Sequence, residues 1–251
     1  MPHVVQTALF LGLAGIVAGI IGTAGGITTL VAYPALLAVG IPPLAANVTN
    51  SVAMLGSGLG SASRAAPDIT GQGATIRRWL PVCITMSVAG AVLLVVTPGG
   101  VFGRVVPFLV AAGSLILLMQ PRISKWQEDN EHAWGPAAVS GVLGAVSLYN
   151  GYFGAGSGIL LIGLLLLTTE PVLHRANAVK NVLLAASDIL PAVLFASMGT
   201  VVWTAAIPLG TGTIAGGLIG PSIARRAHHG ILRVLIACTG FALAGWLIIG
   251  S

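Results

Sequence analysis

Charged side chains are scarce in this chain of 251 residues, and their scarcity excludes a water-soluble fold. Only 7% of the residues are Asp, Glu, Lys or Arg, whereas 56% are hydrophobic. Soluble domains carry about 25% charged residues, so a soluble fold of this length could not cover its surface. Lipid must be the solvent for most of the side chains. The high contents of glycine and proline agree with this, because both are commoner in membrane helices than in soluble ones.

The groups that mark enzymes, metal sites and nucleic-acid surfaces are also missing. The two cysteines, Cys83 and Cys238, lie inside apolar runs, and we interpret them as small hydrophobic residues. The histidines are scattered, and no Ser-His-Asp or Cys-His arrangement can be assembled from the sequence. The net charge of +5 comes from basic residues in short loops rather than from a clustered basic face. We therefore expect no catalytic residue, no metal, no cofactor and no nucleic-acid partner.

What the chain has in abundance is apolar segments. They are 4–21, 27–39, 44–63, 79–97, 104–119, 135–152, 156–169, 176–198, 201–223 and 231–249. Several are long enough for a helix to cross a hydrocarbon core of about 30 Å, but segments 27–39 and 156–169 are short and follow glycine-rich breaks. The pattern predicts an all-α, polytopic membrane bundle. The number of spans is left open, because the short segments either cross the membrane or are re-entrant.

The two halves of the chain repeat one another in order. The matched pairs are Gly22/Gly154, Gly26/Gly158 and Ile27/Ile159 at an offset of 132 residues, Asn47/Asn177, Val52/Val182 and Ser57/Ser187 at 130, and Pro81/Pro208, Gly90/Gly217 and Gly113/Gly240 at 127. The offset changes only between segments, as differences in loop length would produce. We divide the chain into a first membrane repeat, 1–120, a polar linker, 121–134, and a second membrane repeat, 135–251.

Each half holds five apolar segments, and an odd number gives the halves opposite orientations. This is the inverted-repeat arrangement of many secondary transporters. If the N-terminus lies outside, ten of the eleven Lys and Arg residues fall on the inner side and Arg104 falls outside. That distribution obeys the positive-inside rule. We therefore expect both termini outside and the linker 121–134 in the cytoplasm.

The strongest local pattern is the pair of glycine-rich breaks at 22–26 and 154–158. Glycine allows a membrane helix to unwind. A short helix that begins after each break would aim the positive end of its dipole at the break, which suits an anion. We predict substrate contacts at Thr23, Gly25, Gly26, Gly156 and Ser157. The alternative is that these small residues only allow helices to pack closely.

Polar side chains cluster on two matched apolar segments. The predicted binding residues are Asn47, Asn50 and Ser51 in the first half and Asn177, Lys180 and Asn181 in the second. Amides and charges inside apolar helices are expensive and usually face a bundle interior or a cavity. Interhelical hydrogen bonding is the alternative for the asparagines. For Lys180 the alternative is that its side chain extends to the membrane interface.

Asp188 is the one acidic residue near the middle of an apolar segment. Lys180 precedes it by two helical turns, about 12 Å by helical rise, so the two side chains cannot pair directly. We predict that Asp188 is the coupling group of a transporter and exchanges protons or another ion. A structural role, in which the carboxylate accepts a buried hydrogen bond, is the alternative.

Several motifs give the sequence a family resemblance. They are Gly22–Gly26, Tyr33-Pro34, Gly40-Ile41-Pro42, Ala46–Ser51, Gly154–Gly158 and Arg175–Val182. With these motifs the chain resembles the TauE/SafE sulfite-exporter family, also called the 4-toluene sulfonate uptake permease family. The resemblance implies an inner-membrane transporter for sulfur-containing anions such as sulfite, sulfonates or sulfoacetate. Ser157 stands where a glycine is common in the family.

The resulting hypothesis is a secondary transporter that moves a small anion by alternating access between the repeats. Its partners are the anion, the bilayer, and H⁺ or another coupling ion. An anion channel of the same architecture is the second hypothesis. A membrane-embedded enzyme or structural subunit is the third, although the sequence offers it no nucleophile-base pair. The substrate, the direction of transport and the oligomeric state are left open.

Overall fold

The computed structural model of the chain is a bundle of helices, and it describes residues 2–65, 68–129, 135–224 and 229–249. The helices are α1 (Pro2–Gly25), α2 (Thr28–Ala38), α3 (Pro43–Ala65), α4 (Gly73–Val96), α5 (Gly99–Asp129), α6 (Pro136–Tyr152), α7 (Ser157–Thr168), α8 (Leu173–Ser197), α9 (Trp203–Ala224) and α10 (His229–Ile249). Within these ranges there is no strand. The predicted all-α, polytopic fold is confirmed, with one helix for each apolar segment.

The outer surface of the bundle is apolar and suited to contact with lipid. Among the described residues, four stretches are long and apolar enough to cross a membrane: Val5–Thr23 in α1, Gly73–Val96 in α4, Gly99–Met119 in α5 and Leu173–Ser197 in α8. Large apolar side chains on the outside of the bundle are exposed, as Phe108 is at 66%. An apolar exterior of this kind is stable in hydrocarbon and costly in water.

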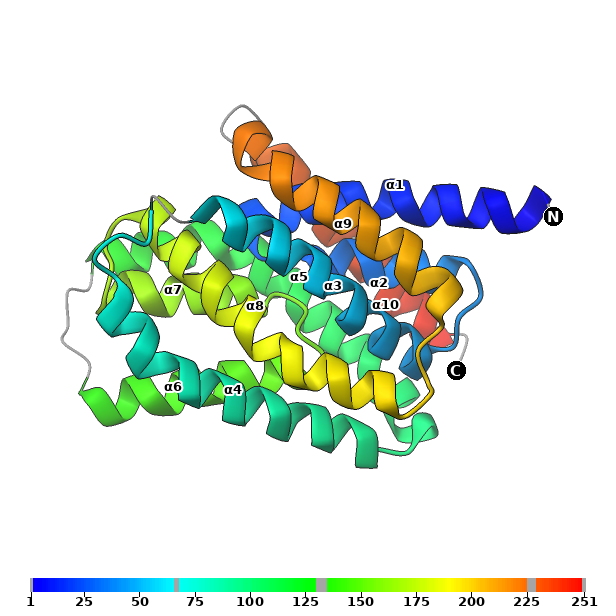
Figure 1. Ribbon diagram of the computed structural model, residues 1–251, viewed down its shortest axis with the longest axis horizontal. Coiled ribbons are helices and arrows are strands. Elements are labelled where there is room, and N and C mark those ends of the chain that lie inside the picture. The colour runs from blue at the N-terminus through cyan, green and yellow to red at the C-terminus, as the bar shows by residue number, and fades with distance from the viewer. Residues whose placement is uncertain (1, 66–67, 130–134, 225–228, 250–251) are drawn as a thin grey trace.

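Helix contacts occur in pairs that relate one half of the chain to the other. α1 packs along α9 at one edge of the bundle, and α6 packs along α4 at the opposite edge (Figure 1). α3 packs on α9 as α8 packs on α4, while α3 crosses α8 and α5 packs on α10. Exchanging each helix of the first half for its counterpart in the second reproduces the same set of contacts. The contacts thus follow the duplication in the sequence, and the opposite orientation of the halves stays a prediction.

Small residues bring the edge helices together. A Cβ added to Gly15 of α1 would lie 2.3 Å from the carbonyl oxygen of Leu209 in α9. In the matched contact, a Cβ on Gly90 of α4 would lie 2.0 Å from the carbonyl oxygen of Leu148 in α6. Neither position has space for a side chain. These glycines are therefore packing residues, as small residues commonly are between membrane helices.

The two short helices follow breaks in the backbone. Gly26, between α1 and α2, has φ +70°, and Gly154 and Gly156, between α6 and α7, each have φ +80°. These left-handed conformations favour glycine over any residue with a Cβ. The helices α2 and α7 have 11 and 12 residues, which is too short to cross a core of about 30 Å. Each forms a hairpin with the helix before it.

The polar linker is not a separate loop over most of its length. α5 continues through it to Asp129, and the rest of it, 130–134, lies outside the described residues. The two cysteines, Cys83 and Cys238, are both free.

Candidate functional site

The two glycine breaks meet in the middle of the bundle. A Cβ added to Gly26 would lie 2.6 Å from Cα of Gly158, and one added to Gly158 would lie 2.5 Å from Cα of Gly26. Neither glycine can be replaced without moving the backbone of the other half. The structure therefore brings the two breaks into direct contact.

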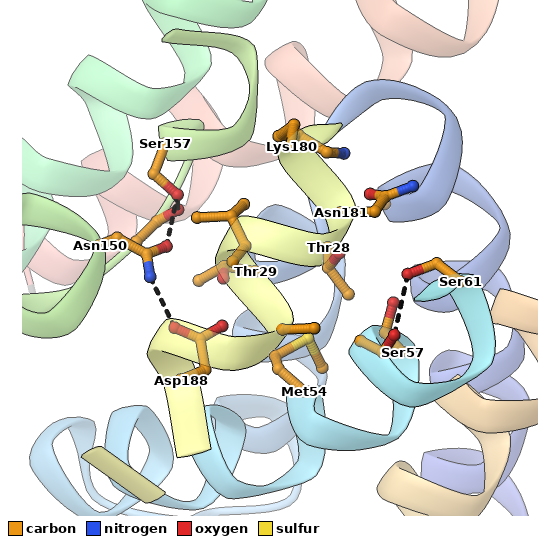
Figure 2. Close-up of a pocket in the computed structure, with 16 residues that line it drawn as sticks. Thr28, Thr29, Met54, Ser57, Ser61, Asn150, Ser157, Lys180, Asn181 and Asp188 are labelled. Atoms are coloured by element: carbon orange, nitrogen blue, oxygen red, sulfur yellow. Dashed lines mark hydrogen bonds between the residues drawn. The ribbon is translucent and has the colours of Figure 1, made fainter. Parts of the chain in front are cut away.

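A cavity of about 80 Å³ lies beside this contact (Figure 2). It is lined by Gly22, Gly26, Thr28 and Thr29 from the first break, Met54, Ser57, Gly58 and Ser61 from α3, Asn150, Gly154 and Ser157 from the second break, and Lys180, Asn181, Leu184, Ala185 and Asp188 from α8. We call it the lysine cavity.

The first residues of both α2 and α7 line the lysine cavity. In the described structure, neither N-terminus is capped by a side chain. The first N–H groups of a helix have no partner within the helix, and they form the positive end of its dipole. Two such ends beside one cavity favour an anion within it, as predicted for helices that begin after the breaks.

Lys180 brings a full positive charge to the same cavity. Its side chain is 1% exposed, and within the described part of the chain it makes no hydrogen bond and no ion pair. A buried ammonium without a partner is costly. The side chain is buried within the bundle and lines the cavity. Lys180 lies inside α8 rather than in a loop.

Asp188 joins the second break through a chain of two hydrogen bonds (Figure 2). Asn150 Nδ2 donates to Asp188 Oδ1 at 2.6 Å, and Ser157 Oγ donates to Asn150 Oδ1 at 2.7 Å. Thus Ser157 fixes the orientation of the Asn150 amide. The carboxylate accepts a hydrogen bond from Asn150, and it also lines the lysine cavity.

Sequence reasoning missed Asn150. Its matched position in the first half, at the offset of 132, is Ala18, so the comparison of the repeats passed over it. An amide four residues before a glycine break was the available signal.

A second cavity, of about 40 Å³, lies further along α3 and α8, and we call it the aspartate cavity. Its lining residues are Thr29, Asn50, Ser51, Met54, Asn150, Gly151, Phe153, Gly154, Asp188, Pro191 and Phe195. Five of these line the lysine cavity as well: Thr29, Met54, Asn150, Gly154 and Asp188. They stand between the two cavities, so Asp188 faces both.

The two cavities use equivalent positions of the repeats. Positions 50, 51 and 54 on α3 line the aspartate cavity, and positions 180, 181 and 184 on α8 line the lysine cavity. The two sets match at the offset of 130.

Comparison with known proteins gives the chain a family. The model of the sulfite exporter TauE/SafE family matches residues 7–247, which is nearly the whole chain. The chain belongs to the TauE/SafE family. Similar proteins include "Probable membrane transporter protein ORF9" of Sinorhizobium sp, 29% identical over 94% of this chain and 90% of the relative. No solved structure matches.

Two further relatives carry the same kind of name. "Probable membrane transporter protein YfcA" of Escherichia coli (strain K12) is 25% identical over 95% of this chain and 87% of its own length. A "Probable membrane transporter protein" of Haemophilus influenzae is 24% identical over 93% and 91%. With its apolar helices, this TauE/SafE protein is a multi-pass membrane transporter.

Asn47 and Asn177 of this TauE/SafE protein each tie one half to the other. Asn47 Nδ2 donates to the carbonyl oxygen of Tyr152 at 2.9 Å, and Asn177 Nδ2 donates to that of Thr23 at 3.0 Å. Both acceptors lie in the last turn of a helix that ends at a break, where carbonyls lack partners within the helix. Neither asparagine lines a cavity among the described residues, and these bonds agree with the alternative of interhelical hydrogen bonding.

The other predicted contacts at the breaks are also taken up by local structure. Thr23 Oγ1 donates to the carbonyl oxygen of Gly19 at 2.6 Å, and Gly156 occupies the left-handed N-cap position of α7. Gly25 is the last residue of α1, and its surroundings lie outside the described residues. The structure therefore gathers seven predicted residues around the cavities. Gly26, Ser157, Lys180, Asn181 and Asp188 line the lysine cavity, and Asn50, Ser51 and Asp188 line the aspartate cavity.

A polar cluster links the two halves where α8 begins, and sequence reasoning missed it. Glu170 is 4% exposed; it pairs with Arg175 at 3.4 Å and accepts a hydrogen bond from Gln72 Nε2. Arg175 Nη2 also donates to the carbonyl oxygen of Thr70 at 3.0 Å. The loop before α4 and the loop before α8 thus lie together at one end of the bundle. We call this cluster the Glu170 latch.

Proposed function

We propose that this TauE/SafE protein is a secondary transporter that binds a small, sulfur-containing anion in the lysine cavity. The observation that carries the proposal is the Lys180 ammonium, which is buried, has no partner among the described residues and faces a cavity. A bound anion would supply the missing partner. The sulfur-containing class comes from the name of the family, sulfite exporter.

The dimensions and chemistry of the cavity favour a small oxyanion. A volume of about 80 Å³ has room for several waters, because about 10 to 15 Å³ of such volume is enough for one. Hydroxyl groups of Thr28 and Ser57 line the cavity together with the Asn181 amide, and each has a hydrogen to donate. Sulfite is therefore a better candidate for this conformation than a large organic sulfonate.

Alternating access between inverted repeats is the mechanism that we propose. Two features support it: the helix contacts that match between the halves, and the use of equivalent α3 and α8 positions by two separate cavities. In transporters with inverted repeats, the site lies at the repeat interface, and rocking of one repeat against the other exposes it to each side in turn. We propose an inner-membrane protein with both termini outside, on the strength of its loop charges.

A screen of thermal stability tests anion binding. A ligand that binds only the folded protein stabilises it by RT ln(1 + [L]/Kd), about 2.7 kcal/mol at a hundred times Kd. We expect sulfite to raise the Tm of the purified protein, and expect Lys180→Met to abolish that rise. Arg77→Met, which removes an exposed charge outside the cavity, is the matched control and should keep it.

The screen also has an outcome that contradicts the proposal. If sulfite, thiosulfate, sulfonates and carboxylates all leave the Tm unchanged, or stabilise the Lys180→Met variant as well as the wild type, the lysine cavity is not the anion site. A channel is distinguished by transport into proteoliposomes, because only a coupled transporter accumulates the anion against its gradient.

A further inference from the structure

The aspartate cavity contains oxygen atoms without partners. Asn50 is 1% exposed, and its Nδ2 donates to Thr29 Oγ1 at 3.4 Å, while its Oδ1 accepts no hydrogen bond. Asp188 uses Oδ1 to accept from Asn150, and among the described residues its Oδ2 has no partner and the carboxylate has no ion pair. Two residues that line the same cavity therefore each have an oxygen without a partner among the described residues.

We propose that the aspartate cavity is a binding site for Na⁺, held by Asp188 and Asn50, and that this ion couples transport of the anion. The inference rests on the proposed function, since it names the ion that drives anion movement. It assigns separate sites to the two ions, with Asp188 between them.

The donor atoms favour a hard cation. Carboxylate and amide oxygens at the cavity, with the hydroxyl oxygens of Thr29 and Ser51 beside them, are the ligands that alkali and alkaline-earth cations prefer over nitrogen or sulfur donors. The single carboxylate supplies one negative charge, which balances a monovalent ion. No Lys or Arg is among the residues that line this cavity in the described structure.

The backbone adds a negative potential. Gly151 and Phe153, at the C-terminal end of α6, line the aspartate cavity but not the lysine cavity. The C-terminal end of a helix is the negative end of its dipole, and broken membrane helices use such ends to coordinate Na⁺. The second break thus presents the end of α6 to the aspartate cavity and the start of α7 to the lysine cavity.

The unpaired oxygens distinguish Na⁺ from the other occupants of the aspartate cavity. The volume of about 40 Å³ has room for an ion, because about 10 to 15 Å³ of such volume is enough for one water. A proton on Asp188 would leave Asn50 Oδ1 without a partner. A water would satisfy both oxygens but would leave the carboxylate without a counter-ion. Na⁺ supplies both a partner for the amide oxygen and a counter-ion for the carboxylate.

The shared position of Asp188 explains why the two ions would help each other. An ionised Asp188 repels an anion in the lysine cavity, and Na⁺ on its other side reduces that repulsion. Coupling of this kind is reciprocal, with typical factors of about 5 to 150. We expect Na⁺ to increase the affinity for sulfite by about tenfold, and sulfite to increase the affinity for Na⁺ by the same factor.

The experiment measures Tm of the purified protein in NaCl, KCl and choline chloride at equal ionic strength, without anionic substrate. We expect NaCl alone to raise the Tm, with saturation as its concentration increases. Asn50→Leu and Asp188→Asn should both remove the response to Na⁺. Asn181→Leu is the matched control, because Asn181 lines only the lysine cavity, and this variant should keep the response.

Three results overturn the Na⁺ site, and a fourth separates it from the anion site. Equal Tm values in the three salts overturn it, even where sulfite stabilises the protein and the anion site stands. A full response to Na⁺ in both variants places the ion elsewhere. If the variants do not fold, the wild-type affinity for sulfite decides: equal values in Na⁺ and K⁺ also overturn the proposal. A response to Na⁺ without any response to anions would sustain the Na⁺ site and contradict the proposed substrate class.

Discussion

The matched helices α3 and α8 occupy equivalent places in the two halves but carry different side chains. At the offset of 130, Asn50 corresponds to Lys180 and Gly58 corresponds to Asp188, so α3 carries a neutral residue wherever α8 carries a charge. Space accounts for part of the difference, because a Cβ on Gly58 would lie 3.0 Å from Cβ of Ala185 in α8. The first repeat allows the close approach, and the second repeat supplies the charges. The two duplicated halves therefore make different contributions to one site.

Removing the Asp188 carboxylate should have the largest effect on transport. We expect Asp188→Asn to insert and fold normally and to abolish uphill transport, while substrate binding and exchange are largely retained. Asparagine keeps the size of the side chain and its hydrogen bond with Asn150, but it can neither release a proton nor balance a cation. The measurement is accumulation of labelled substrate in proteoliposomes, compared with exchange at equal concentrations on both sides. Wild-type accumulation by the variant would make Asp188 a structural residue.

Replacing Lys180 by its counterpart tests the other charge. Lys180→Asn gives α8 the residue that α3 has at position 50. We expect the affinity for sulfite to fall at least about 100-fold, or about 2.7 kcal/mol, because the one full positive charge in the lining of the lysine cavity is lost. The Tm without anion should not fall, since a buried charge without a partner is costly. Titration calorimetry measures the affinity, and an unchanged Kd would remove Lys180 from the site.

Filling the space at Gly58 should have a moderate effect. Gly58→Ala forces α3 and α8 apart, and overpacking of this kind costs about 1 to 3 kcal/mol. Gly141→Ala is the control, because a Cβ at Gly141 in α6 meets nothing within 4 Å, and alanine in a helix is favoured over glycine by about 0.5 to 1 kcal/mol. The measurement is the Tm of both variants. Equal Tm values would show that the close approach of α3 and α8 is not needed for stability.

The orientation of the halves is tested without changing the site. In a protein without Cys83 and Cys238, a cysteine introduced at Gly73 should resist a membrane-impermeant thiol reagent added to intact cells. The reason is that the loop before α4 lies beside basic residues, which favour the cytoplasmic side. A cysteine at Gly199, in the loop before α9, is the control and should react. Rapid reaction at position 73 would reverse the proposed topology.

Much of the architecture is predictable from the sequence because it depends on local patterns. Apolar runs define the helices, and the glycine breaks at 22–26 and 154–158 mark their interruptions. The roles of Asn150 and Glu170 were not predictable, because their partners lie 38 and 98 residues away along the chain. The periodicity of polar residues in the sequence shows which face of a helix is polar. It does not show which residue of another helix contacts that face. For the same reason, Asn47 and Lys180 look alike in the sequence, as polar residues in apolar helices. In the structure, Asn47 donates a hydrogen bond to a carbonyl oxygen and Lys180 faces a cavity.

The Glu170 latch has a consequence for how often the protein would open at that end. Separating the two loops breaks two hydrogen bonds, from Gln72 to Glu170 and from Arg175 to Thr70. The pairing of Arg175 with Glu170 joins α8 to the loop before it and survives the separation. The exposed bond from Arg175 contributes about 0.5 to 1.5 kcal/mol net and the bond to the Glu170 carboxylate about 1.5 to 3, so the latch holds the loops together by roughly 2 to 4.5 kcal/mol. If only these bonds kept the loops together, roughly one molecule in several hundred would have them separated. A ligand that binds the separated state could then increase its population.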